Sequence, residues 1–217
     1  MMRDLFTIWI CKVVYWFLRK TGRHGAALPG LIAEKLRPSL IKKISMLPEG
    51  IIVVSGTNGK TTTTHLTAEA LRRMGKRVFT NHSGSNMTRG LLASIVRFSS
   101  LTGRLPYDVA VLEIDEAYAA KLAPILKPKA CILTNVLRDQ LDRFGEIDHT
   151  AKLLKVLASH CTELVVYNVC DPRLRQLEIR KGARAITYGY TDAIASNFPN
   201  DDEWHDSAKR AKVPTSS

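Results

Sequence analysis

The chain has 217 residues, of which 45% are hydrophobic and 24% are charged, a balance that excludes a wholly disordered protein. Its length suffices for one substantial α/β domain with an appendage. The formal net charge is +12, and half of it lies in residues 1–50, which hold nine Lys or Arg against three Asp or Glu. A basic surface fits nucleic acid, an anionic membrane or a phosphorylated substrate. Because no RNA-binding or helix-turn-helix pattern is present, we expect no nucleic-acid partner.

The most hydrophobic stretch is residues 5–18, near the amino terminus. It includes Lys12, and it is shorter than the roughly 20 apolar residues that a membrane-spanning helix needs. Arg19, Lys20 and Arg23 follow it in place of a cleavage site. The pattern predicts an amphipathic helix that either lies on an anionic membrane surface or packs against the main domain or a partner. We assign residues 1–48 to a helical, basic segment.

From residue 51 onward, short β-branched runs alternate with longer amphipathic stretches, which is typical of a parallel sheet covered by helices. We predict strands at 51–55, 77–80, 108–115, 129–134, 163–168 and 183–188, and helices at 60–74, 89–101, 116–126, 148–160 and 172–180. The predicted fold is a doubly wound α/β domain with a mostly parallel sheet over residues 49–190. Residues 191–217 form a polar tail without periodicity, which we expect to be disordered.

The four cysteines are dispersed without any C-x-x-C pair, and three of them lie in or beside apolar runs. Such cysteines are typically buried free thiols, and they suit a reducing cytoplasm.

Residues 51–62 read as a buried strand, a glycine-bearing turn and the start of a helix, which is the arrangement of a phosphate-binding loop. Gly56 and Gly59 would let the backbone N–H groups of Thr57 and Asn58 turn inward, and the following helix adds unpaired N–H donors. We predict that Lys60 contacts the β- and γ-phosphates of ATP, while the hydroxyl of Thr61 binds magnesium and Thr62 completes the loop. The strict G-x-x-x-x-G-K-[ST] pattern is not met, because its first glycine would fall at Val54.

A second polar site is predicted at the end of the strand 108–115. Glu113 lies between Leu112 and Ile114, and ligands gather at the carboxyl ends of parallel strands. A carboxylate beside a phosphate loop can hold Mg²⁺ directly or through water. Asp115 and Glu116 fit a solvated strand end better than Glu113 does.

The loop G-T-N-G-K-T-T at residues 56–62 resembles the ATP loop of the Mur ligase family, whose members activate a carboxylate as an acyl phosphate and join it to an amine. The resemblance implies that Glu113 is the strand-borne metal ligand and that Asn86 lies at the γ-phosphate or the metal. Gln140 stands where most members have a histidine that helps to bind a second Mg²⁺. Asn168 and Asp171 resemble an element that contacts the adenosine part of ATP, although an Asp-Pro helix start explains that sequence equally well.

Residues 112–117 and 138–146 together resemble the MurT branch of this family, the ligase subunit of lipid II isoglutaminyl synthase. The resemblance implies a GatD-like glutamine amidotransferase as partner, lipid II or a related cell-wall precursor as substrate, and ATP with Mg²⁺ as cofactors. A zinc ribbon and a C-terminal domain, which such subunits carry, are not part of these 217 residues. Three hypotheses follow: a short MurT-like ligase, a non-catalytic nucleotide-binding module that acts through a partner, and another P-loop protein such as a small kinase.

Overall fold

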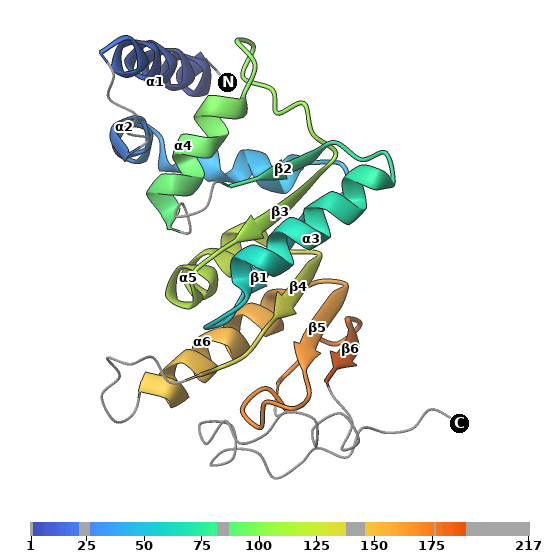
Figure 1. Cartoon of the computed structure of the whole chain (residues 1–217). Helices are drawn as coiled ribbons and strands as arrows, with labels where there is room; N and C mark the ends of the chain where they lie inside the picture. Colours follow the sequence, from blue (N-terminus) through green and yellow to red (C-terminus); the bar gives the residue numbers. More distant parts are fainter. Residues whose placement is uncertain (1, 22–26, 82–86, 138–145, 176, 190–217) are drawn as a thin grey trace.

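The computed structural model describes residues 2–21, 27–81, 87–137, 146–175 and 177–189. Within them, six parallel strands form one sheet in the order β2-β3-β1-β4-β5-β6, with helices packed against it (Figure 1). The strands are β1 (Ile51–Ser55), β2 (Val78–Thr80), β3 (Val109–Glu113), β4 (Ala130–Leu133), β5 (Leu164–Asn168) and β6 (Arg184–Tyr188). The predicted doubly wound α/β fold is confirmed, and every adjacent strand pair is parallel.

The helices divide between the two faces of the sheet. α3 (Lys60–Arg73) covers one face of β2, β3 and β1, where Ala68 packs with Val54, Val109 and Val111. The other face carries the larger core, to which the remaining helices contribute (Figure 1). These are α1 (Met2–Lys20), α2 (Ala27–Leu36), the 3₁₀ helix η1 (Pro38–Met46), α4 (Thr88–Phe98), α5 (Glu116–Leu126) and α6 (Glu146–His160).

Strand alternation explains both cores. In β3, Val109 and Val111 face α3, whereas Ala110 and Leu112 belong to the larger core on the opposite face. Both faces of the central strands are therefore apolar, as a parallel sheet with helices on both sides requires. All four cysteines are buried free thiols, as the sequence predicts.

The predicted helix at residues 172–180 is wrong. Residues 172–175 form turns and residues 177–180 have no regular structure, between β5 and β6. Side-chain oxygens of Asn168 and Asp171 accept hydrogen bonds from the backbone N–H groups of Cys170 and Arg173, at 2.9 and 3.0 Å. Such local side-chain bonds compete with helix formation, and the one fully buried anchor of this stretch is Leu174.

The amino-terminal segment extends the core at the β2 end of the sheet. α1 packs on α2 and α4 through Ile8 and Cys11, which are fully buried. Residues of η1, including Leu40 and Ile44, belong to the same apolar cluster as β1 and β3. α1 is thus the outermost element at this end (Figure 1).

Candidate nucleotide-binding site

The candidate site lies at the carboxyl end of β1, the strand between β3 and β4. After Ser55 the chain turns through Gly56 and Gly59, which have φ angles of +128° and +81°, and α3 begins at Lys60. The N-cap residue of α3 is Gly59, which has no side chain to cap the helix. The first N–H groups of α3 have no intrahelical partner, and with the helix dipole they favour an anion.

Close packing against the loop after β4 fixes the shape of this turn. A Cβ atom on Gly56 would lie 2.3 Å from the Thr134 hydroxyl oxygen and 2.9 Å from the Asn135 carbonyl oxygen. No side chain fits there, so glycine is required both for its φ angle and for its lack of volume.

Hydrogen bonds join the same two segments. The N–H of Thr57 donates to the carbonyl of Asn135 at 2.9 Å, and the N–H of Asn58 donates to its side-chain oxygen at 2.9 Å. The Thr57 hydroxyl accepts from the N–H of Leu137 at 3.1 Å. The amides of Thr57 and Asn58 are thus already bonded, whereas within the described ranges those of Gly59, Lys60, Thr61 and Thr62 remain for a phosphate.

The side chain of Lys60 folds back over the loop. Its ammonium group donates to the carbonyl of Gly56 at 2.5 Å and to that of Thr57 at 3.0 Å. The Glu116 carboxylate, at the first residue of α5, lies 3.7 Å away, and the two side chains are only 15% and 13% exposed. Lys60 is therefore held in place beside an acid at the phosphate loop.

Glu113 ends β3 beside the loop, paired in register with Val54 of β1. Its side chain lies on the α3 face of the sheet, because Glu113 continues the alternation of Val109 and Val111. The side chain of Asn81 fixes its backbone: it accepts from the N–H of Glu113 at 2.9 Å and donates to its carbonyl at 2.7 Å. Among the described residues, no hydrogen bond or ion pair engages the Glu113 carboxylate, although Glu113 is only 9% exposed.

The neighbouring carboxylates are engaged elsewhere. Asp115 caps α5 by accepting from the N–H of Ala117 at 3.1 Å. Of the carboxylates Glu113, Asp115 and Glu116, all within the described part of the chain, Glu113 is therefore the one without a partner there, and its role as a metal ligand with the Thr61 hydroxyl stays a prediction. Within the described ranges no group of three or more His, Cys, Asp or Glu side chains could form a metal centre by itself. Magnesium bound here would take its other ligands from phosphate and water, as it commonly does.

The residues predicted to contact adenosine lie at the end of β5. Asn168 bonds its own turn, and Asp171 is buried. One Asp171 oxygen accepts from the N–H of Val136 at 2.5 Å, which ties this turn to the loop after β4. Their contact with adenosine stays a prediction. The remaining predicted residues, Asn86 and Gln140, lie outside the described residues.

Three residues have contacts in this site that the sequence analysis did not assign: Glu116 pairs with Lys60, Asn135 bonds the loop, and Asn81 bonds the backbone of Glu113. The expectation of a solvated strand end is wrong for Glu116, whose side chain is only 13% exposed at the start of α5. The two asparagines act through contacts 77 and 32 residues away in sequence, which no local pattern reveals.

The fold and the site define a phosphate-binding-loop protein of the parallel α/β class. The chain belongs to the Mur ligase family, because the profile of the Mur ligase middle domain matches residues 54–214. It is 32% identical over 197 residues to the lipid II isoglutaminyl synthase subunit MurT of Staphylococcus aureus, covering 91% of this chain and 44% of that protein. It is 40% identical over 141 residues to MurT of Streptococcus pneumoniae, covering 64% of this chain and 30% of that protein.

Among solved structures, MurF ligase from Thermotoga maritima in complex with ADP matches with a TM-score of 0.60 and 23% identity, over 74% of this chain and 36% of MurF. At that identity the likeness shows the fold. The chain spans less than half the length of these curated relatives.

Proposed function

We propose that this chain binds ATP with Mg²⁺ and serves as the nucleotide-binding part of a carbon–nitrogen ligase of peptidoglycan synthesis. The observation that carries the proposal is the start of α3, whose N-cap Gly59 provides no side-chain cap, beside a Glu113 carboxylate that no described residue engages. The amides of Gly59 to Thr62 and the Lys60 ammonium supply donors for the β- and γ-phosphates. Glu113 and Thr61 supply oxygen ligands for Mg²⁺, which would neutralise the phosphate charge.

The proposed reaction is the activation of a carboxylate of lipid II, D-glutamate by resemblance to MurT. A carboxylate oxygen attacks the γ-phosphorus, the bond to ADP breaks, and an acyl phosphate forms; ammonia then displaces phosphate and leaves an amide. Phosphoryl transfer depends mainly on positioning and on charge stabilisation. The residues of this chain hold the phosphates and the cation, while an acceptor must be brought in line by other groups.

The proposed partner is a GatD-like glutamine amidotransferase, which would supply the ammonia. The similarity to MurT, named as a subunit of a glutamine-hydrolysing synthase, supports this pairing. We place the reaction in the cytoplasm, where ATP is available and where the four buried free thiols stay reduced.

Two measurements test the proposal on the purified chain. Calorimetric titration with ATP, with and without Mg²⁺, should show binding that the metal strengthens. The chain with its amidotransferase, glutamine, ATP and lipid II should then yield amidated lipid II and ADP, which mass spectrometry detects. Absence of ATP binding would refute the proposal, because every later step depends on bound ATP.

A non-catalytic nucleotide-binding module that acts through a partner is the second candidate, because the loop and Glu113 can serve nucleotide binding alone. ATP binding without amidation, also in the presence of the amidotransferase, would establish that role. Phosphate transfer to a small acceptor with no amide product would instead indicate a kinase.

A further inference from the structure

The outer face of α1 carries six large apolar side chains that are more than half exposed. Their exposed fractions are 85% for Met2, 66% for Phe6, 52% for Trp9, 64% for Val13, 62% for Trp16 and 60% for Phe17. The first five recur at intervals of three or four residues, and Phe17 lies four residues after Val13, so they form one stripe along a helix of 19 residues, about 28 Å long. Leu101, 69% exposed, adjoins the stripe, because its carbonyl accepts from the Trp9 indole N–H at 2.8 Å.

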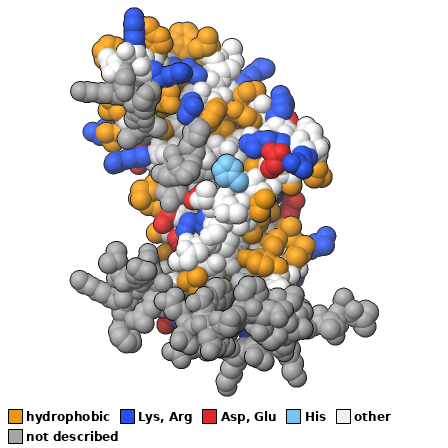
Figure 2. Space-filling view, in the orientation of Figure 1, with side chains coloured by type: hydrophobic (Ala, Val, Ile, Leu, Met, Phe, Trp, Pro, Cys, Tyr) orange, Lys and Arg blue, Asp and Glu red, His pale blue; other side chains and the backbone are white. Residues whose placement is uncertain are grey.

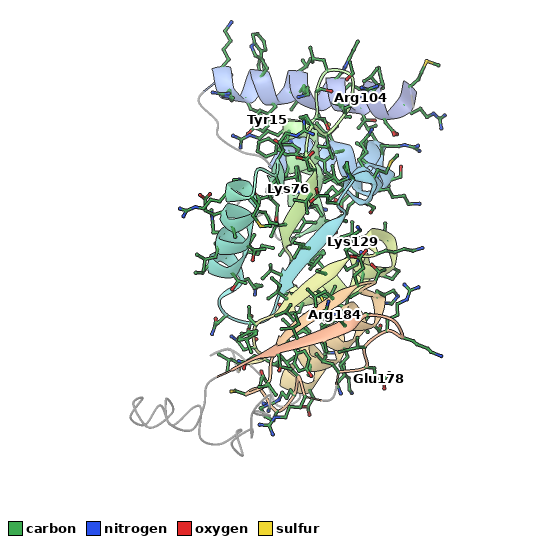
Figure 3. The ribbon with its side chains drawn as sticks, turned by 90° about the vertical axis from the view of Figure 1, so that its right-hand side faces the viewer. Tyr15, Lys76, Arg104, Lys129, Glu178 and Arg184 are labelled. Carbon is green, nitrogen blue, oxygen red and sulfur yellow. The ribbon has the colours of Figure 1, made fainter. Side chains whose placement is uncertain are left out.

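The stripe faces away from the protein. The opposite side of α1, with Thr7, Ile8 and Cys11, is buried against the domain. In Figure 3, α1 lies across one end of the molecule, with Tyr15 on the side of the domain. Figure 2 shows hydrophobic side chains interspersed with Lys and Arg at this end. Soluble proteins seldom expose apolar patches of this extent unless something covers them.

The charges around the stripe are positive. Arg3, Arg19 and Lys20 are exposed, and the Lys20 ammonium lies 5.1 Å from the centroid of the Trp16 ring. The one acid of α1, Asp4, is neutralised by Arg37 at 2.7 Å.

The other two acids among the first 50 residues are also paired, Glu34 with Arg89 and Glu49 with Lys76. The face therefore presents cations and aromatic rings, without a free carboxylate among its described residues.

We propose that α1 docks this protein on an anionic lipid bilayer, lying in the plane of the interface with the stripe inserted among the acyl chains. Indole and phenyl rings favour the boundary between headgroups and acyl chains, and flanking Arg and Lys contact lipid phosphates. None of the described helices is long and apolar enough to cross the membrane. The contact is thus on the surface of the bilayer.

A second copy of α1 would fit the stripe less well. An antiparallel pair would bring Arg3 of one helix near Arg19 and Lys20 of the other, and Asp4, the one acid of α1, is already paired with Arg37. A lipid surface supplies both the apolar layer and the anions. The inference stands without the ligase chemistry, because α1 packs on α2 and α4, which do not carry the phosphate loop.

Vesicle binding tests the proposal with the full chain. We expect it to co-sediment with vesicles of phosphatidylcholine and phosphatidylglycerol, at least tenfold more strongly than with pure phosphatidylcholine. Salt raised from 0.1 to 0.5 M should weaken binding severalfold. In a Trp204→Phe background, fluorescence reports Trp9 and Trp16 alone and should shift to the blue on binding.

Matched substitutions locate the contact. Phe6→Glu and Trp16→Glu should each lower the partition coefficient about tenfold or more. Leu66→Glu, the same kind of change at a 67% exposed position on α3, should leave it within twofold. Since all three side chains are exposed, circular dichroism should show each variant folded, and ATP affinity should not change.

Three results would overturn the proposal. The first is the lack of binding to either vesicle, and the second is an equal loss in Leu66→Glu. The third is a concentration-dependent dimer that Trp16→Glu dissociates, without vesicle binding, which would assign the stripe to a second copy of the chain. If the chain does not bind vesicles but does bind ATP, the membrane proposal is wrong and the proposed function is unaffected.

Discussion

The ammonium group of Lys60 lies 3.7 Å from the carboxylate of Glu116, so the first residues of α3 and α5 face each other across the phosphate loop. Both side chains are largely buried, which makes the pair less screened than a surface ion pair. An arriving phosphate must compete with Glu116 for the lysine. Without nucleotide, the pair therefore masks part of the positive charge of the site.

Glu116→Gln should tighten ATP binding in the absence of metal by about three- to tenfold, because the lysine charge is then no longer neutralised. Calorimetry at low salt measures the effect. Glu69→Gln is the matched control, since Glu69 pairs with Arg73 on the exposed side of α3. Weaker ATP binding in Glu116→Gln would contradict the expectation and show instead that Glu116 positions Lys60.

Lys60→Ala should weaken ATP binding at least about a hundredfold, because charge-assisted contacts to phosphate are lost. The fold should persist, because the substitution removes no core packing. Among the residues that the structure describes, the ammonium bonds the carbonyls of Gly56 and Thr57 and pairs with Glu116. Calorimetry and urea unfolding measure the two effects separately. Lys121→Ala, at an exposed position of α5, serves as control. Retained ATP affinity in Lys60→Ala would refute the assignment of the loop.

Glu113→Gln should weaken the dependence of ATP binding on Mg²⁺ more than it changes ATP binding without metal. The amide is a poorer ligand for a hard cation, and it removes one negative charge beside the phosphates. Titrations of ATP at several Mg²⁺ concentrations give both quantities. Asp115→Asn keeps a capping side chain on α5 and should leave the Mg²⁺ dependence unchanged. Equal effects of Glu113→Gln on both quantities would argue against a metal ligand.

Gly56→Ala should destabilise the protein by about 3 kcal/mol or more, since the new Cβ meets Thr134 and the Asn135 backbone. Gly59→Ala should cost only about 1–2 kcal/mol, because the φ angle is strained there but nothing lies within 4 Å of the new atom. Urea midpoints at unchanged slope compare the two. Equal losses of stability in the two variants would mean that the close contact of Gly56 with the loop after β4 contributes little to the cost of Gly56→Ala.

Much of the sheet could be predicted, because the strands are β-branched runs bounded by turns, and both faces of the central strands are buried. Ile51 to Ser55 and Arg184 to Tyr188 illustrate the two extremes. The first is a core strand read directly from its hydrophobicity. The second is an exposed edge strand, and its Ile, Thr and Tyr residues still predict a strand there.

The site was predictable only where chemistry and local pattern coincide. Lys60 follows a glycine turn, and Glu113 is an acid inside an apolar strand, so both stand out in the sequence. The role of Glu116 depends on where α5 begins relative to α3, and Asp171 acts on the N–H of Val136, 35 residues away. Such contacts follow from the strand order, which hydrophobic periodicity does not specify.

Asp108 precedes β3, and hydrogen bonds from the side chain and then the backbone N–H of Arg77 lower its pKa from the ordinary 3.8 to about 2. A carboxylate with a lowered pKa in the folded state stabilises the protein above its unfolded pKa, and that contribution is lost as the pH falls through the folded value. Asp108→Asn should therefore reduce the urea midpoint by a constant amount from about pH 5 to 8, and the difference from the unmodified chain should shrink between about pH 4 and 2. Arg77→Met removes the partner of Asp108 and should produce the same pH dependence. A difference that stays constant down to pH 2 would show that the ion pair does not hold the pKa of Asp108 down.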